Sequence, residues 1–114
     1  YPTDDQNVNL RALRTLKEAF PEHPVGYSDH SRGIEACLAA VALGAEVLEK
    51  HFTYHLRMPG DDHEGALTPE MLRALVQRVG RIEAMLGTEE KEPVAAEAKA
   101  MAALRVKMRE VGFD

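Results

Sequence analysis

Apolar residues recur along this chain with two different periods, which predict helices and strands in alternation. A spacing of three or four is typical of a helix with one buried face, and strict alternation is typical of a strand. The strand pattern occupies residues 25–30 and 45–52. The helical pattern occupies residues 9–20, 34–43, 68–87 and 92–114. Because helices separate two short strands, the expected fold class is α/β, with βα units and a parallel sheet.

Residues that start or stop helices mark the expected ends. Thr68 is expected to cap the helix 68–87, with Pro69 at its first position and Gly87 at its end. Asn7 or Asn9 can cap the first helix, and Gly44 can close the second. The last helix has a thin apolar face, so we expect it to pack on something else. The expected stripes are Leu10, Leu13, Leu16 and Phe20, then Met71, Leu75, Val79, Ile82 and Leu86, and finally Met101, Leu104, Met108 and Val111.

Composition places the chain among globular proteins of one domain. It has 114 residues, of which 45% are apolar and 29% are charged. The formal net charge of −5 argues against nonspecific binding to nucleic acid. No apolar run approaches the roughly 20 residues that cross a membrane. We expect a cytoplasmic protein whose one cysteine, Cys37, is a buried core residue.

Polar side chains gather on one face of the two expected strands. Ser28 and His30 share a face of the first strand, and Glu49 and His51 share a face of the second. Neighbouring strands lie about 4.8 Å apart, so two histidines at adjacent carboxyl ends can converge on one ion. Such ligands suit Mn²⁺, Fe²⁺ or Zn²⁺. The alternative is that each histidine is only hydrogen-bonded at its strand end.

The opposite strand face carries Asp29 on the first strand, and Leu48, Lys50 and Phe52 on the second. We expect this face to lie against the apolar helix layer, even though it includes Lys50. Asp29 is then expected to have a structural or capping role near Gly33.

The segment 53–67 has the composition of a loop. Asp61 and Asp62 follow Pro59-Gly60, a turn signal, so they are either solvated or held over the site at the strand ends. His55 and His63 are either loop residues or further ligands.

Three motifs of this chain resemble those of the sialic acid synthase family, including its spore-coat polysaccharide biosynthesis protein E type. They are GYSDH at residues 26–30, EKHFT at 49–53 and MPG followed by DH at 58–63. The resemblance runs from the N-terminal tyrosine to about residue 86. It implies a (β/α)₈ TIM barrel of about 250 residues, of which residues 1–87 supply the part from the loop after strand six through helix eight. Residues 88–114 are expected to form a linker and an extra helix, without a recognisable antifreeze-like domain.

The resemblance also implies an activity. Family members condense phosphoenolpyruvate with N-acetylmannosamine or a related amino sugar, or its 6-phosphate, and release phosphate in surface polysaccharide biosynthesis. It implies a divalent metal, with Mn²⁺ expected and Mg²⁺ or Co²⁺ as alternatives, and a homodimer in the full-length protein. We expect one further role that the resemblance does not imply: the carboxylate of Glu49 can orient a ligand histidine. The implied roles are metal binding and catalysis for His30 and His51, phosphoenolpyruvate binding for Ser28, and amino sugar binding for Tyr1 and Asp62.

Two other functions stay open. The open sheet edges of a partial barrel favour pairing with another chain, so the chain could be a non-catalytic interaction or assembly module. A different metal-dependent barrel enzyme, such as an aldolase, requires the three motifs to coincide by chance. Asp4 and Asp61 stand where the family usually has proline, so the amino sugar is left open. Catalysis is expected to need earlier barrel strands that are absent from this chain.

Overall fold

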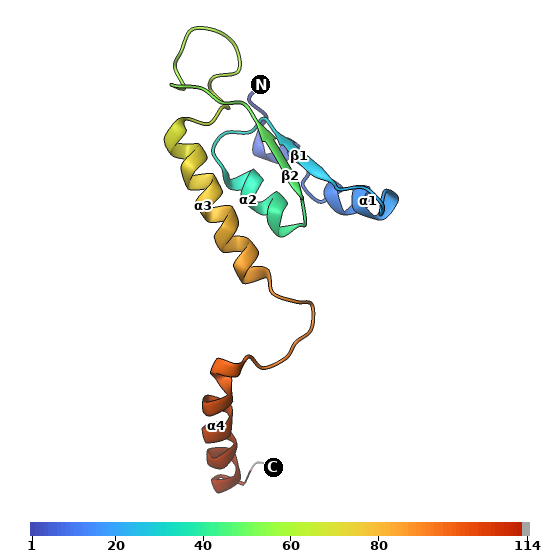
Figure 1. Cartoon of the computed structure of the whole chain (residues 1–114), viewed down its shortest axis with the longest axis vertical. Coiled ribbons are helices and arrows are strands. Elements are labelled where there is room, and N and C mark those ends of the chain that lie inside the picture. Colours follow the sequence, from blue (N-terminus) through green and yellow to red (C-terminus); the bar gives the residue numbers. More distant parts are fainter. Residues whose placement is uncertain (113–114) are drawn as a thin grey trace.

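The computed structural model describes residues 1–112 as an elongated molecule of 70 × 34 × 24 Å. Strands and helices of the N-terminal part form one body, and a last helix stands apart from it (Figure 1). The predicted order of helices and strands is confirmed. The elements are the short 3₁₀ helix η1 (Asp5–Asn7), α1 (Ala12–Ala19), β1 (Gly26–Asp29), α2 (Glu35–Ala42), β2 (Val47–Lys50), α3 (Pro69–Leu86), the 3₁₀ helix η2 (Ala95–Glu97) and α4 (Ala98–Glu110).

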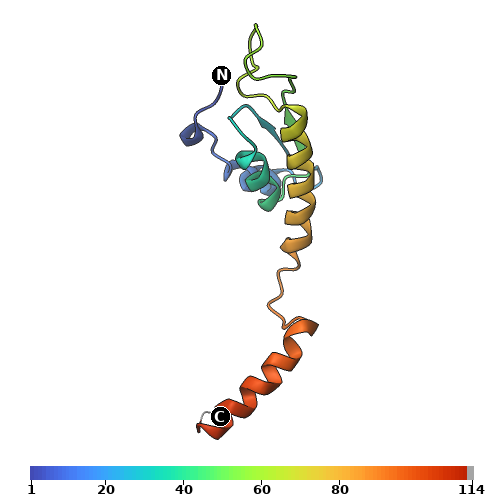
Figure 2. The same cartoon turned by 90° about the vertical axis from the view of Figure 1, so that its left-hand side faces the viewer.

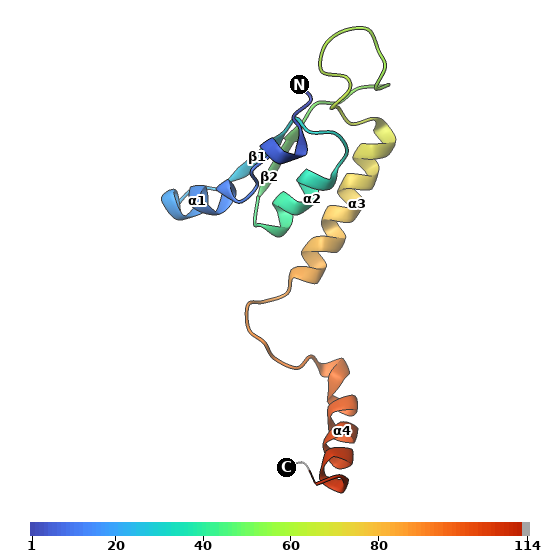
Figure 3. The ribbon, with the colours of Figure 1, turned by 180° about the vertical axis from the view of Figure 1, so that it is seen from behind.

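The two strands pair in parallel, as the alternation of helices and strands predicts. Their register places Ser28 opposite Glu49 and Asp29 opposite Lys50. Helix α2 is the crossover between them, and α3 lies beside α2, as seen from the front and from behind (Figures 1 and 3). The ends of both strands therefore lie at one edge of the body, next to the 53–67 loop.

Two apolar clusters hold the strands against the helices. Cys37 is fully buried and not in a disulfide, which confirms the core role predicted for it. The first cluster joins α2 to α3 and consists of Ile34, Cys37, Leu67 and Leu75, with Leu38, Leu48, Met71 and Val79 packed against it. The second joins α1 to α2 and β1 and consists of Leu13, Val25 and Ala40, with Leu10, Tyr27, Ala45 and Leu48 around it.

Helix α3 has the ends that the sequence predicts. The Thr68 hydroxyl accepts a hydrogen bond from the Met71 amide at 3.3 Å, and Pro69 follows it at the first position. The helix stops at Gly87, whose φ of 59° lies in the left-handed region that favours glycine. Leu75 of the predicted stripe is buried.

Helix α1 differs from its prediction at both ends. It begins at Ala12, and its N-cap residue is Arg11, without a side-chain cap; neither Asn7 nor Asn9 caps it. Leu13 is buried, but Leu16 and Phe20 are 44% and 54% exposed. The predicted stripe is therefore wrong beyond its first turns, because the described body covers only one end of this face. Phe52, just past β2, is likewise exposed rather than packed under the helices.

The C-terminal helix lies away from the rest of the chain. Residues 87–94 lead to η2 and α4, which extend from the body in each ribbon view (Figures 1, 2 and 3). Its predicted apolar face is mostly exposed, at Leu104, Met108 and Val111. The division of the chain between residues 87 and 88 stays a prediction. None of the helices in residues 1–112 combines the length and apolar character of a membrane span.

Candidate functional site

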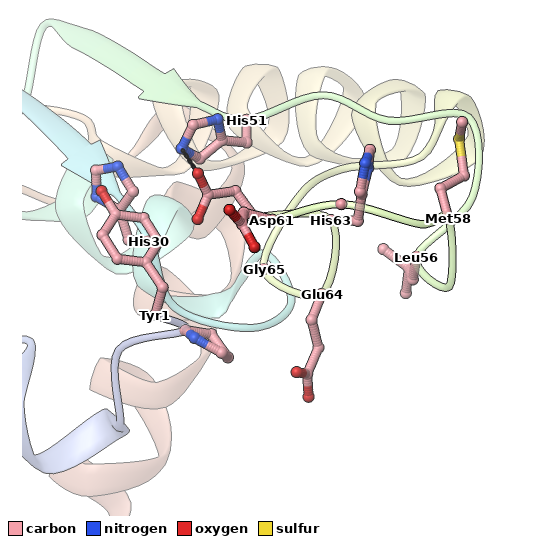
Figure 4. A pocket seen from close by; sticks show the side chains of 12 residues that line it. Tyr1, His30, His51, Leu56, Met58, Asp61, His63, Glu64 and Gly65 are labelled. Atoms are coloured by element: carbon pink, nitrogen blue, oxygen red, sulfur yellow. Dashed lines mark ion pairs between the residues drawn. The ribbon is translucent and has the colours of Figure 1, made fainter.

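The site lies where the two strands end. His30 follows β1 and His51 follows β2, so the parallel register places the two histidines next to each other. Their ring centroids are 5.3 Å apart, with 65° between the ring planes. The Tyr1 ring lies 4.6 Å from that of His30 and 6.1 Å from that of His51 (Figure 4).

Backbone hydrogen bonds from two other segments hold the histidines in place. The Thr3 amide donates to the His30 carbonyl at 2.8 Å, which keeps the N-terminal residues beside β1. The Leu67 amide donates to the His51 carbonyl, also at 2.8 Å. Gly65 passes so close that a Cβ there would lie 3.2 Å from the His30 carbonyl oxygen. Because glycine has no side chain, the loop can pass this close to the end of β1.

These residues line a cavity of about 320 Å³. Asp62 reaches it from the loop, with a φ of 66° that aspartate tolerates better than most residues. Its Oδ2 atom lies 4.0 Å from His51 Nε2, and this pair is dashed in Figure 4. The lining consists of Tyr1, Pro2, His30, His51, Leu56, Met58, Gly60, Asp61, Asp62, His63, Glu64 and Gly65.

The structure brings together four of the six predicted site residues. Tyr1, His30, His51 and Asp62 line the same cavity. The other two, Ser28 and Glu49, are opposite each other in the strand register and exposed, and neither lines this cavity. Glu49 makes no hydrogen bond to His51 within residues 1–112, where Asp62 is the carboxylate that approaches His51. The chemical roles of all six residues stay predictions.

His63 lines the cavity, whereas the sequence left its role open beside that of His55. Its Nδ1 atom lies 2.8 Å from Thr53 Oγ1, and the Thr53 side chain is buried. The same hydroxyl oxygen accepts a hydrogen bond from the His55 amide at 3.3 Å. Thr53 of the EKHFT motif thus contacts His63 of the DH motif. The two residues are ten positions apart, and no periodicity in the loop predicts this contact.

A buried polar network lies on the opposite face of the strands. Asp29 Oδ1 accepts hydrogen bonds from the Ser31 amide at 3.0 Å, the Ser31 hydroxyl at 2.7 Å and the Tyr27 hydroxyl at 3.0 Å. Asp29 Oδ2 pairs with Lys50 Nζ at 2.6 Å and accepts from Cys37 Sγ at 3.3 Å. This network explains why a lysine lies on the helix-covered face, because its charge is fully paired there.

The network shifts the protonation of its members. Burial by itself raises the pKa of Asp29, but hydrogen bonds from Lys50 and Ser31 outweigh it and hold the pKa below its usual value. Burial, followed by the neighbouring Asp29 carboxylate, raises the pKa of the Cys37 thiol to about 12. Burial and the same carboxylate raise the pKa of Tyr27. All three groups therefore keep one protonation state around neutral pH.

The structural role predicted for Asp29 is confirmed, but the capping role is wrong. Its carboxylate binds Ser31 in the turn after β1, two residues away. Helix α2 begins later and its N-cap residue, Ile34, has no side-chain cap. The Ile34 amide donates instead to the Glu35 carboxylate at 2.9 Å.

The donor set at the strand ends fits a divalent ion of borderline softness. Two imidazoles from separate strands face one cavity, and neutral imidazole suits Mn²⁺, Fe²⁺ and Zn²⁺. Within residues 1–112, no group of three His, Cys, Asp or Glu side chains gathers at metal-binding distances. If His30 and His51 held such an ion, water or a substrate would have to fill its other coordination positions.

Fold and site define this chain as part of a parallel α/β protein with a polar site at the carboxyl ends of its strands, the edge where α/β barrels bind ligands. A sequence profile of the NeuB family matches residues 1–91. The chain belongs to the NeuB family.

Relatives in this family include named synthases. The chain is 47% identical over 93 residues to the N,N'-diacetyllegionaminic acid synthase of Legionella pneumophila, covering 82% of this chain and 26% of that protein. It is 42% identical over 97 residues to the human N-acetylneuraminate-9-phosphate synthase, covering 85% of this chain and 27% of that protein. The crystal structure of the N-acetylneuraminic acid synthetase from Leptospira borgpetersenii matches with a TM-score of 0.81 and 43% identity, over 96% of this chain and 38% of that one.

These comparisons also confirm the predicted fold class. The chain is an α/β fragment with parallel strands, and it corresponds to part of its barrel-forming structural neighbours. It spans between a quarter and two fifths of the length of these relatives, as the shares of 26% and 38% show.

Proposed function

We propose that this chain supplies the metal-binding and sugar-binding part of the active site of a nonulosonate synthase. The reaction joins the methylene carbon of phosphoenolpyruvate to the aldehyde carbon of N-acetylmannosamine or a related amino sugar, consumes one water and releases inorganic phosphate. One observation carries the proposal: two imidazoles from adjacent strand ends lie 5.3 Å apart, in a cavity that Tyr1 and Asp62 also line. Its support is the membership of named synthases in the same family.

Each residue at the strand ends has a role that follows from its chemistry. His30 and His51 hold a divalent ion, for which we expect Mn²⁺, through ring nitrogens that their strands bring together. Such an ion, when bound, supplies Lewis-acid polarisation of the sugar carbonyl. Asp62 accepts hydrogen bonds from sugar hydroxyls, and the Tyr1 hydroxyl offers a further donor and acceptor at the cavity wall.

Ser28 has a different place in this proposal. It lies two residues before His30, on the same strand face as that histidine and opposite the buried network. We retain it as a phosphoenolpyruvate contact, since the exposed strand face continues from the histidines toward it. In the barrel proposed here, that face points toward the barrel interior.

The experiment is a phosphate-release assay on a protein that carries this chain at the full length of its relatives. Phosphoenolpyruvate and N-acetylmannosamine, with and without Mn²⁺, are the substrates and conditions. We expect metal-dependent phosphate release, and we expect His30→Ala and His51→Ala each to abolish it and to lower the bound metal. His23→Ala, on an exposed histidine outside the cavity, is the matched control and is expected to keep full activity. Normal activity and metal content in both cavity variants would overturn the ligand assignment.

A second candidate function is an assembly module without catalysis. Its observation is that apolar side chains are exposed on and just after β2, at Val47 and Phe52, and on α4, at Leu104. Exposed strand edges favour pairing with another chain. Native mass spectrometry of the 114-residue chain discriminates: an oligomer supports this function, and a stable monodisperse monomer counts against it.

A further inference from the structure

The buried network lies directly behind the two histidines. Asp29 and Ser31 flank His30 in the sequence, and Lys50 directly precedes His51. The ammonium group of Lys50 lies 2.6 Å from Asp29 Oδ2 and 2.6 Å from the Ser31 carbonyl oxygen. One charged group on the second strand therefore contacts both sequence neighbours of the histidine on the first strand.

We propose that Lys50 is a positioning residue that sets the distance and orientation of the His30 and His51 imidazoles through its bonds to Asp29 and Ser31. This inference rests on the proposed function, in which the two imidazoles hold a divalent ion. The residue proposed to orient His30 and His51 is therefore Lys50, on the strand face that the helices cover, and not Glu49, on the exposed face.

The strand ladder alone does not reach the histidines. Backbone pairing between β1 and β2 ends at the partners Asp29 and Lys50, one residue before each histidine. Beyond that point, the His30 carbonyl is held by Thr3 and the His51 carbonyl by Leu67, so each bond joins a histidine to a third segment. The bonds of the Lys50 ammonium instead run directly from one strand end to the other.

The network is rigid enough for this task. The side chains of Lys50 and Asp29 are 3% and 0% exposed, so solvent cannot replace their mutual contact. The Ser31 amide and hydroxyl both donate to the same Asp29 carboxylate, which fixes the turn that contains His30. Contacts behind the ligands of a metal site orient those ligands and raise metal affinity.

The test uses the double variant Asp29→Asn with Lys50→Met, in a protein that carries this chain at the full length of its relatives. Changing both partners removes the cross-strand ionic contact without leaving one charge buried and unpaired. The readout is the Mn²⁺ dissociation constant without substrate, followed by the electron paramagnetic resonance signal of free Mn²⁺. We expect binding to weaken by about 10- to 100-fold, the range found when contacts behind metal ligands are removed.

Three further variants separate placement from general stability. Lys17→Met removes another lysine that donates to a carbonyl, that of Gly44 at 2.8 Å, far from the strand ends. Leu75→Ala lowers stability through the core cluster that joins α2 to α3, without changing any polar group of the network. Both are expected to keep the wild-type dissociation constant. His30→Ala removes a proposed ligand and is expected to abolish binding.

Four outcomes are informative. Weaker binding in a folded double variant, with normal binding in the Lys17 and Leu75 variants, supports the inference. Equal binding in the wild type and the folded double variant overturns it and leaves the proposed function standing. A wild-type protein that binds no Mn²⁺, or binds it independently of His30, overturns the proposed function and this inference together. Where the double variant does not fold, Asp29→Asn alone is measured; loss of folding there as well overturns the inference, because the pair then serves stability only.

Discussion

Replacing Lys50 with methionine is the sharpest stability test of the buried network. The side chain keeps most of its length and apolar stem but loses the ammonium group that pairs with Asp29 at 2.6 Å. The carboxylate then stays fully buried, with donors from Ser31, Tyr27 and Cys37 but no cation.

The size of the effect follows from the distance and burial. At an effective dielectric constant of about 20, Coulomb's law gives about 6 kcal/mol of attraction for this pair. The cost of removing both charges from water offsets part of that attraction in the wild type, so the net value of the pair is smaller. Removing one partner leaves the cost of burying the other, and we expect Lys50→Met to lower the free energy of unfolding by about 3–5 kcal/mol.

The assay is urea unfolding of the full chain between pH 3 and pH 8, at about one pH unit per step. In the wild type the pKa of Asp29 is below its usual value of 3.8, so the carboxylate contributes stability above that pH and loses it as the pH falls further. Without the cation, burial raises this pKa instead. The difference between variant and wild type should therefore shrink as the pH is lowered and Asp29 takes up a proton.

The matched control is Lys17→Met, whose ion pair with Glu46 is 3.5 Å long and largely exposed. It should cost less than about 1 kcal/mol, because solvent screens such pairs. A loss below about 1 kcal/mol in Lys50→Met, or a loss that does not depend on pH, would refute the reasoning, because Asp29 would then not be a buried paired carboxylate.

Three further predictions concern the helices and the thiol. Cys37 should not react with iodoacetamide in the native protein at pH 8, since burial raises its pKa to about 12, but it should react in urea. Mass spectrometry measures the labelling, and a labelled Cys37 in the native protein would contradict its burial. Leu75→Ala should lower the free energy of unfolding in urea by about 2–5 kcal/mol. Val76→Ala, one position along α3 and 65% exposed, should change this free energy by less than about 0.5 kcal/mol, and equal changes in the two variants would refute the assigned core face. Thr68→Ala should cost about 1 kcal/mol by removing the hydroxyl that caps α3, and Thr68→Ser should retain most of it; an equal loss in both variants would show that the hydroxyl does not act as the cap.

Strand periodicity placed the two histidines together but did not separate them from Ser28 and Glu49, which share their strand face and do not line the cavity. Strand alternation placed His30 and His51 on one face, and their rings lie 5.3 Å apart. The motif resemblance suggested Tyr1 and Asp62, which line the same cavity. No pattern in the loop indicated that His63 would reach the cavity through the Thr53 hydroxyl, because that contact depends on how the loop closes.

The sequence by itself determined the local elements and the faces of the strands. Helix α3 starts at Thr68 and Pro69 and ends at Gly87 because of interactions within a few residues, so a local pattern suffices to predict its ends. Tertiary structure decided which apolar residues are buried: Leu16 and Phe20 fit the periodicity of α1 but extend beyond the body that covers Leu13. It also decided the partners of Asp29 and Lys50, twenty-one positions apart, whose shared burial makes a charged pair part of the core. The physical reason is the same in both cases: periodicity specifies the direction of a side chain, whereas burial and pairing depend on which distant segment packs against it.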